Sequence, residues 1–192
     1  MEFKKVTREW DTLKKDAMER AKNAAPLVKE GKIVDAKDTV ALLEAVIKPY
    51  DKVNIEGNNQ KQADFLAKCL CQVDPAKIHD LHMVQSVLTL PEHLDVFEKG
   101  IAKKLDMSFS GPQAGRIAQF LQEGKLELGA IHTYLELYGR YFVDLTPRVA
   151  LVAATMADRE GNLFTGFSTE DTPAIVEATK FRQGIVIAQV NK

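Results

Sequence analysis

From residue 52 to residue 190 the sequence alternates short apolar segments with longer amphipathic ones, which predicts strands separated by helices. We predict strands at residues 52–56, 78–87, 107–109, 126–131, 149–157 and 184–190. We predict helices at residues 60–72, 91–104, 113–123 and from 172 onward, with 133–141 helical or loop. Strands that alternate with helices form a mostly parallel sheet with helices on both faces, so the pattern indicates an α/β fold.

The last two predicted strands carry the clearest signal. Residues 149–154 are a continuous apolar run, which is typical of a strand covered on both faces. Residues 158–162 form a polar turn before Leu163 and Phe164, so we predict a hairpin there. The segment 184–190 is equally apolar but lies close to the end of the sequence. We therefore expect that the native protein continues, or that a partner chain covers this strand.

Residues 1–50 follow a different pattern. Between residues 8 and 25 charge and alanine dominate, and the few apolar residues recur at helical spacing, namely Trp10, Leu13, Ala17, Ala21 and Ala24. A second helix begins near Asp35 or Asp38 and ends before Pro49, because the residue before a proline disfavours helical backbone angles. We interpret residues 1–50 as an N-terminal helical arm and residues 51–192 as the α/β domain.

Composition narrows the class of protein. The 192 residues include 26 Lys and Arg against 27 Asp and Glu, a formal net charge of −1, which argues against a nucleic-acid partner. No apolar run approaches the roughly 20 residues that span a membrane, and the N-terminus lacks the apolar core of a signal peptide. Cys69 and Cys71 are the only cysteines and predict reduced thiols in a cytoplasmic protein.

The turn after the first predicted strand is the strongest candidate for a binding site. Gly57, Asn58, Asn59 and Gln60 lie between a strand and a helix, where α/β folds bind ligands. Gly57 allows close approach of the backbone, and the asparagines offer amide donors to a developing oxyanion. The loop matches neither a dinucleotide-binding motif nor a triphosphate-binding motif. A plain helix cap is the alternative interpretation.

Two further strand-to-helix turns would reach the same edge of the sheet. The first consists of Ser110, Gly111, Pro112 and Gln113. The second spans residues 167–171. Simple turn chemistry is the alternative for the first turn, and an N-cap at Asp171 or Thr172 is the favoured interpretation of the second.

The histidines give neither a metal site nor a catalytic pair from the sequence alone. They are His79, His82, His93 and His132. His79 and His82 fall three residues apart in a predicted strand, which places them on opposite faces, so we expect no metal. His132 and Tyr134 lie at an apolar-to-polar junction that is suited to line a pocket.

Several longer segments resemble one known family. They are residues 55–66, 79–86, 108–113, 129–137, 144–154 and 169–179. In this order they are similar to the alpha subunit of malonate decarboxylase, a member of the coenzyme A transferase superfamily. The resemblance covers residues 40–191 and implies a coenzyme A transferase-like α/β fold.

The resemblance implies an acyl-carrier-protein transferase. In this family the alpha subunit exchanges acetate for malonate on the thioester of a phosphoribosyl-dephospho-coenzyme A group, which the carrier protein presents. Such transferases proceed through a glutamyl thioester. The family's oxyanion loop follows the first strand of its N-terminal half, which corresponds to Gly57, Asn58 and Asn59 here.

One departure from the family limits what can be carried over. The nucleophilic glutamate of the family belongs to a homologous second half, and the family's alpha subunit is much longer than this chain. We therefore assign the nucleophile to none of the glutamates Glu56, Glu136, Glu170 and Glu177. The resemblance implies an N-terminal portion that supplies the oxyanion and acyl-binding side and is inactive alone.

The resemblance also implies the partners. These are the acyl carrier subunit and the other malonate decarboxylase subunits, with malonate and acetate as substrates, and a homo-oligomer stays open. Two other functions stay open as well. One is a non-catalytic module that docks a carrier protein or sister subunits. The other is a sugar-phosphate isomerase-like domain, for which the expected phosphate-binding glycine loop is missing.

Overall fold

A six-stranded parallel sheet lies at the centre of the molecule, within residues 11–57, 62–166 and 170–190 that the computed structural model describes. Its strand order is β4-β3-β2-β1-β5-β8. The strands are β1 (Lys52–Ile55), β2 (Leu81–Val87), β3 (Ala102–Phe109), β4 (Glu127–Ile131), β5 (Val149–Ala154) and β8 (Ile185–Val190). The parallel α/β sheet that the sequence predicts is confirmed.

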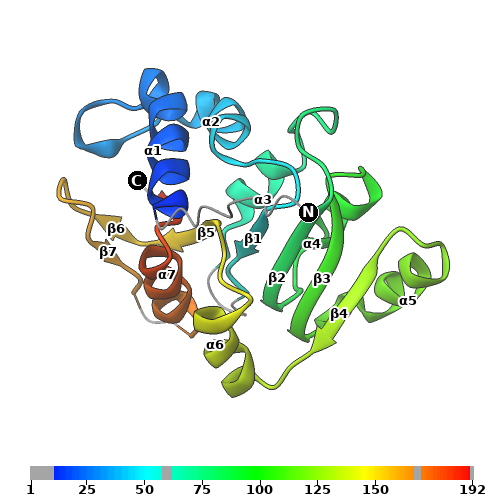
Figure 1. Ribbon diagram of the computed structural model, residues 1–192. Helices are drawn as coiled ribbons and strands as arrows, with labels where there is room; N and C mark the ends of the chain where they lie inside the picture. The colour runs from blue at the N-terminus through cyan, green and yellow to red at the C-terminus, as the bar shows by residue number, and fades with distance from the viewer. Residues whose placement is uncertain (1–10, 58–61, 167–169, 191–192) are drawn as a thin grey trace, which may run out of the picture.

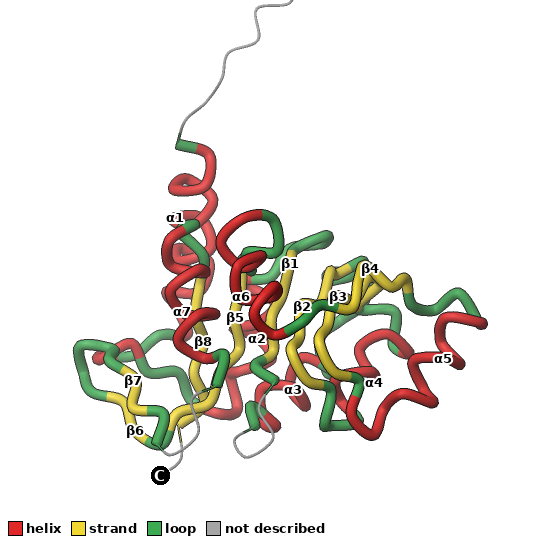
Figure 2. The backbone as a smooth tube through the Cα atoms, turned by 90° about the horizontal axis from the view of Figure 1, so that it is seen from below, coloured by secondary structure: helices red, strands yellow, loops and turns green. Residues whose placement is uncertain are grey.

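Helices cover both faces of this sheet (Figures 1 and 2). One face packs under α2 (Thr39–Val46), α3 (Asp64–Leu70), α4 (Glu92–Glu98) and α5 (Ala114–Gln122). The other packs under α6 (Tyr134–Val143) and α7 (Thr172–Phe181). Short 3-10 turns complete the described helices, namely η1 (Ala25–Leu27), η2 (Glu30–Lys32), η3 (Ala36–Asp38) and η4 (Gly111–Gln113). Among the described residues, no helix combines the length and apolar character needed to cross a membrane.

The two faces, which we call the α3 face and the α6 face, differ in character. Successive residues of a strand point to opposite sides, so one strand can serve both faces. On the α3 face, β1, β2 and β3 bury the apolar residues Val53, Ile55, Leu81, Met83 and Leu105. On the α6 face the same strands carry mostly polar residues, namely Lys52, Asn54, His82, Ser86, Lys104, Asp106 and Ser108. The α3 face therefore holds most of the hydrophobic core.

The N-terminal helix α1 (Thr12–Ala24) is held by an ion pair rather than by the predicted apolar stripe. Arg20 and Ala24 are its buried residues, whereas Leu13 is 40% exposed. Arg20 pairs with Asp51 and with Asp16, and its guanidinium donates to the Val46 carbonyl at 2.6 Å. Trp10 lies outside the described residues. The division of the chain near residue 50 into an arm and a domain stays a prediction.

The helix predicted at residues 91–104 is too long. Helix α4 ends at Glu98, and Gly100 follows with a φ of +73° that a helix does not allow. Strand β3 then begins at Ala102, so the strand predicted only at residues 107–109 is eight residues long. The polar residues on its α6 face break the apolar run that would have identified it.

Smaller differences concern the ends of elements. Helix α3 is shorter than the predicted helix at residues 60–72, and its Phe65 is 37% exposed. Strand β2 begins at Leu81 rather than at residue 78. The predicted hairpin is confirmed, because β6 (Met156–Ala157) pairs antiparallel with β7 (Leu163–Phe164).

Strand β8 forms one edge of the sheet. It pairs with β5 over its whole length, and residues 185–189 are only partly buried. The apolar run at 184–190 is therefore a strand, as predicted, but it is not covered on all sides within the described residues. A continuation or a partner chain over this strand stays a prediction.

Candidate functional site

The topology marks the carboxyl end of β1 as a binding position. From β1 the sheet grows in one direction through β2, β3 and β4, and in the other through β5 and β8. In open parallel sheets, ligands bind beyond the carboxyl ends of the strands where the order reverses in this way. Residues 56 and 57 follow β1 at this point, so the first predicted turn lies where the fold favours a site.

Gly57 lies against the end of β2 more closely than any other residue type allows. A Cβ atom at this position would stand 2.3 Å from the Val87 nitrogen and 2.5 Å from the Ser86 hydroxyl oxygen. The Ser86 hydroxyl donates to the Gly57 carbonyl at 2.9 Å. The start of the predicted oxyanion turn is therefore held firmly, while Asn58, Asn59 and Gln60 lie outside the described residues.

Asp171 connects this turn to helix α7. It occupies the predicted N-cap position but makes no capping hydrogen bond. Instead, its buried carboxyl group accepts from the Gly57 N–H and shares a very short hydrogen bond with the Ser86 hydroxyl. The predicted N-cap position of Asp171 is confirmed, but its side chain bonds to the turn rather than to the first turn of α7. Because the Gly57 N–H is occupied, any backbone oxyanion donor of this turn must come from a later residue.

The protonation of Asp171 follows from its surroundings. Burial raises the pKa of Asp171 to about 7 against the lowering effect of the Ser86 hydrogen bond, and the nearby Glu56 carboxylate adds to the rise. The Ser86 hydroxyl has a single hydrogen, which it donates to Gly57 when a protonated Asp171 donates to Ser86. The neutral carboxyl group thus completes a chain of hydrogen bonds from α7 to the turn.

Glu56 and Thr172 complete the same group. The Glu56 side chain is fully buried and accepts from the Thr172 hydroxyl at 2.7 Å. We call Glu56, Gly57, Ser86, Asp171 and Thr172 the carboxyl-end cluster. Sequence reasoning missed Ser86, although a serine in an otherwise buried strand is a signal that could have found it.

Two tyrosines of α6 lie near the carboxyl-end cluster. Burial raises the pKa of Tyr138 to about 12, and the negative charges of Asp171 and Glu170 add to the effect. The pKa of Tyr134 is raised by the same causes, and its ring meets that of Tyr138 with centroids 6.3 Å apart. Both hydroxyls therefore remain protonated at neutral pH, and the pocket role of Tyr134 stays a prediction.

The second predicted turn lies beside the first without a described bond to it. Its residues are Ser110, Gly111, Pro112 and Gln113, which lead from β3 into η4 and α5. A Cβ atom on Gly111 would stand 2.9 Å from the Leu88 carbonyl oxygen, so this turn packs just beyond the end of β2. Gln113 is buried, whereas Pro112 is exposed. The pocket roles of these four residues stay predictions.

His132 is not positioned as a free pocket residue. Its side chain is only 1% exposed, and its Nε2 atom lies 2.7 Å from Asp106 Oδ1. The other carboxylate oxygen of Asp106 lies 2.6 Å from His82 Nε2, and His132 Nδ1 lies 3.1 Å from Glu136. The structure therefore joins His82, Asp106 and His132 in one hydrogen-bonded chain on the α6 face.

Asp106 is the centre of this chain. Burial acts to raise the pKa of Asp106, but the hydrogen bonds from His82 and His132 outweigh it and hold the pKa below its ordinary value. Gly129 makes room for the carboxylate, since a Cβ atom there would stand 2.0 Å from Asp106 Oδ2. Sequence reasoning missed this chain because the third predicted strand began only at residue 107, after Asp106. Within the described part of the chain, no group of three or more His, Cys, Asp or Glu residues is arranged to hold a metal ion.

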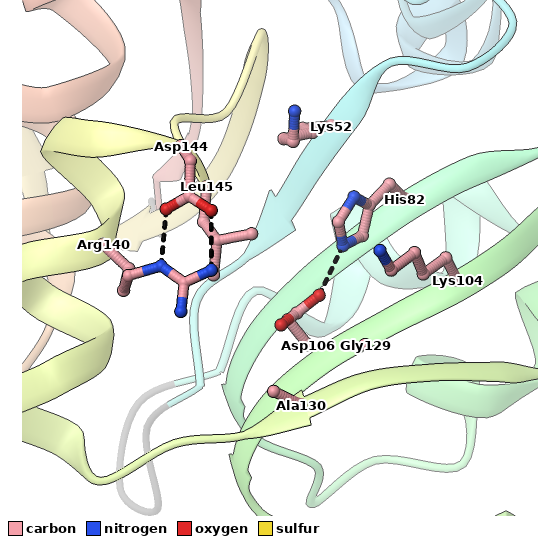
Figure 3. A pocket seen from close by; sticks show the side chains of 9 residues that line it. All are labelled: Lys52, His82, Lys104, Asp106, Gly129, Ala130, Arg140, Asp144 and Leu145. Carbon is pink, nitrogen blue, oxygen red and sulfur yellow. Dashed lines mark hydrogen bonds and ion pairs between the residues drawn. The ribbon is translucent and has the colours of Figure 1, made fainter.

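A cavity of about 350 Å³ opens beside this chain, at the amino ends of the strands (Figure 3). Its lining combines strand residues with the end of α6, namely Lys52, His82, Lys104, Asp106, Gly129, Ala130, Arg140, Asp144 and Leu145. Lys52 and Gly57 stand at opposite ends of β1, about 16 Å apart at the usual rise of a strand. The cavity is therefore separate from the carboxyl-end cluster.

Comparison with known proteins identifies the family. A family model described as malonate decarboxylase, alpha subunit, transporter matches residues 9–192. The chain belongs to the malonate decarboxylase alpha-subunit family. A curated relative from Malonomonas rubra, acetyl-S-ACP:malonate ACP transferase, is 64% identical over 183 residues, which cover 95% of this chain and 33% of the relative. The resemblance inferred from the sequence is thereby confirmed.

Solved structures agree with this membership. A Pseudomonas malonate decarboxylase hetero-tetramer in complex with malonate contains a chain that is 56% identical and superposes with a TM-score of 0.92, covering 96% of this chain and 34% of that one. The malonate decarboxylase alpha subunit of Acinetobacter baumannii is 51% identical with the same TM-score, over 95% of this chain and 34% of that one. The malonate decarboxylase alpha-subunit chain described here thus spans about a third of the length of these relatives.

Proposed function

We propose that this chain is the N-terminal portion of an acyl-carrier-protein transferase, which exchanges acetate for malonate on the carrier's thioester. The observation that carries the proposal is the Gly57 turn, which is fixed at the switch point of the sheet by Ser86 and Asp171. Membership of the malonate decarboxylase alpha-subunit family and the 64% identity to an acetyl-S-ACP:malonate ACP transferase support it.

The role proposed for this portion is to stabilise charge during acyl exchange. The overall reaction converts an acetyl thioester and malonate into a malonyl thioester and acetate. Each acyl transfer places negative charge on a carbonyl oxygen, and fixed N–H and amide donors stabilise that charge. We assign the donors to Asn58, Asn59 and Gln60, because the Gly57 N–H is occupied by Asp171.

The nucleophile is assigned to the part of the subunit that this sequence does not contain. Glu56 is the glutamate nearest to the Gly57 turn, but its carboxylate is buried and accepts from Thr172. Glu136 is hydrogen-bonded to His132 and lies within ion-pair distance of Arg140. Neither is placed to attack a thioester that enters from outside.

The same proposal includes the partners and the location. The phosphoribosyl-dephospho-coenzyme A group would arrive as part of the acyl carrier subunit, so it is a substrate here. Sister subunits of malonate decarboxylase would complete the assembly, as in the hetero-tetramer from Pseudomonas. Two free, buried cysteines support a cytoplasmic location, because cytoplasmic thiols stay reduced.

Asn59→Ala in the complete alpha subunit, assembled with its partners, tests the proposal. We expect the rate of acetyl-to-malonyl exchange to fall by at least tenfold, since loss of one oxyanion donor costs about 10²–10³ in rate. Asn23→Ala changes the same residue type at an exposed position of α1 and serves as the control. Equal rates for the Asn59→Ala, Asn23→Ala and unmodified proteins would remove the oxyanion role from this loop.

A non-catalytic docking module is the second candidate. The observation in its favour is the exposure of apolar side chains at the ends of β3 and β4 and at the start of α6, with Phe109 55%, Ile131 63% and Leu135 83% exposed. On this alternative, Ile131→Ser would weaken binding of the carrier protein while Asn59→Ala left exchange unchanged. The proposed transferase role predicts instead that Asn59→Ala slows acyl exchange.

A further inference from the structure

The cavity at the amino ends of the strands is built around a row of basic residues. The register pairs Lys52 of β1 with His82 of β2, and His82 with Lys104 of β3. All three side chains lie on the α6 face and line the cavity. Figure 3 shows them on one side of it, with the Arg140–Asp144 pair of α6 on the other.

The two lysines of this row are not direct neighbours in the sheet. His82 separates Lys52 from Lys104, and Glu127 of β4 pairs with Lys104 in the register, but its carboxylate lies within ion-pair distance of Lys103 instead. The side chains of Lys52 and Lys104 make no ion pair or hydrogen bond with any residue that the structure describes, whereas the side chain of their neighbour Lys103 does both on the opposite face. The two lysines therefore leave positive charge concentrated at the cavity.

The carboxylates of the cavity already have hydrogen-bond partners of their own. Asp106 is bound between His82 and His132. Asp144 accepts two hydrogen bonds from Arg140, one of them at 2.6 Å, and this contact holds the pKa of Asp144 below its ordinary value. Three cations face two carboxylates in the lining, so the cavity keeps a net positive charge before either histidine is counted.

We propose that this cavity binds the phosphate group of a small phosphate-bearing molecule through Lys52 and Lys104. The site is separate from that of the proposed transfer reaction, because the cavity lies at the amino ends of the strands and the Gly57 turn lies at their carboxyl ends. Gly129 and Ala130 also line the cavity, whose volume of about 350 Å³ leaves space beside the phosphate for an organic remainder.

The available donors suit a phosphate group. The fork of Arg140 is occupied by Asp144, so it is not free to bind an anion in a bidentate manner. The remaining donors are two ammonium groups, which act as point charges and suit the tetrahedral oxygens of a phosphate. His82 adds a third polar group in the same row.

Isothermal titration calorimetry of the full chain with inorganic phosphate tests the proposal. We expect saturable binding with a dissociation constant of about 1 mM or tighter, which two charge-assisted contacts would provide. Lys52→Gln and Lys104→Gln should each weaken binding by about tenfold, the loss expected for one charge-assisted hydrogen bond. Lys103→Gln, the adjacent lysine on the opposite face of β3, should leave binding within about twofold, because it contributes no contact to the phosphate.

Four results would overturn the assignment. Phosphate that never saturates the chain would remove the site. Equal weakening by Lys103→Gln and Lys104→Gln would reduce it to unspecific charge attraction, and unchanged binding in both Lys52→Gln and Lys104→Gln would place phosphate elsewhere. Malonate binding that depends on the two lysines, without phosphate binding, would make the cavity a carboxylate site.

Two phosphate-bearing probes distinguish the source of the phosphate. Tighter binding of glycerol 3-phosphate than of dephospho-coenzyme A would support a free phosphate ester as the ligand. The opposite order would support the diphosphate of the carrier's prosthetic group. Circular dichroism of each variant confirms that it is folded before its binding is compared.

Discussion

The two faces of the central sheet divide stability and chemistry between them. On the α3 face the strands bury apolar side chains such as Val53, Ile55 and Leu105, none of which is exposed. On the α6 face the next residues along the same strands include Asn54 and Asp106, whose side chains make specific hydrogen bonds. Because each strand alternates between the faces, one side can hold the core while the other arranges polar groups.

The α6 face also explains how polar side chains are tolerated in the interior. Burying a polar group costs free energy unless it is hydrogen-bonded. The Asn54 amide donates to the Val84 carbonyl at 2.7 Å and to the Tyr141 hydroxyl at 3.3 Å, and Asp106 is bonded to two histidines. These bonds offset part of the cost of burial. The stability of the α6 face therefore depends on well-placed hydrogen bonds, whereas that of the α3 face depends on apolar packing.

Leu105→Ala is expected to have the largest effect on stability, because it removes packing from the α3 face. Leu105 is fully buried in the core of the α3 face, so truncation leaves a cavity and should lower the free energy of unfolding by about 3–4 kcal/mol. Leu128→Ala is the matched control, because Leu128 pairs with Leu105 in the sheet but is 37% exposed. Urea denaturation followed by circular dichroism measures both. A loss at Leu128 as large as that at Leu105 would contradict the assignment of Leu105 to the packed core of the α3 face, because the two residues lie on that same face and differ in burial.

Asp171→Asn tests how a buried polar group on the α6 side affects the pH dependence of stability. Burial raises the pKa of Asp171 from the ordinary 3.8 to about 7, so between these pH values the folded protein holds a proton that the unfolded chain has released. The free energy of unfolding therefore falls as pH rises through this window, by about 3 kcal/mol for this group. Asparagine keeps the donor to Ser86 and the acceptor for Gly57 without titrating, so the variant should gain stability relative to the parent as pH rises from 4 to 7.

Denaturation of the Asp171→Asn variant at several pH values tests this expectation. Asp11→Asn, at an exposed position just before α1, is the control and should leave the pH profile unchanged. A parallel shift of the Asp171→Asn profile at every pH would show that Asp171 does not titrate in the folded protein. In that case its hold on the Gly57 turn would not depend on a neutral carboxyl group.

The difference between the faces also explains which parts of the fold could be predicted from the sequence. Strand β5 was recognisable because every residue is apolar and buried, whichever side it faces. Strand β3 was not, because Lys104, Asp106 and Ser108 interrupt its apolar residues at every second position. When polar residues occupy every second position of a central strand, its sequence lacks the continuous apolar run by which a buried strand is recognised.

The candidate site was predictable to a smaller extent. The Gly57 turn could be located, since a glycine between a strand and a helix is a local signal. Its partner Asp171 could not, because the two residues meet only after the chain has passed through most of the sheet. The chain of His82, Asp106 and His132 likewise depends on the register between β2, β3 and the end of β4, which no local pattern contains.

His93→Leu is the smallest of the expected effects and tests the α3 face by titration. His93 is fully buried in α4, and neither ring nitrogen has a hydrogen-bond partner among the described residues. Burial lowers the pKa of His93 from the ordinary 6.5 to about 4. Below pH 6.5 the unfolded chain therefore binds a proton that the folded protein does not, and the free energy of unfolding falls as pH drops.

Leucine at position 93 removes this linkage, so the advantage of the variant over the parent should grow by about 2 kcal/mol between pH 8 and pH 5. Denaturation at these two pH values measures the difference. His79→Leu, at a half-buried position before β2, is the control and should give a smaller change. The slope for His93 runs opposite to that for Asp171, because burial disfavours the charged form of each group and the two carry charges of opposite sign. If both variants instead gained stability in the same direction of pH, burial would not be the common cause of the two shifts.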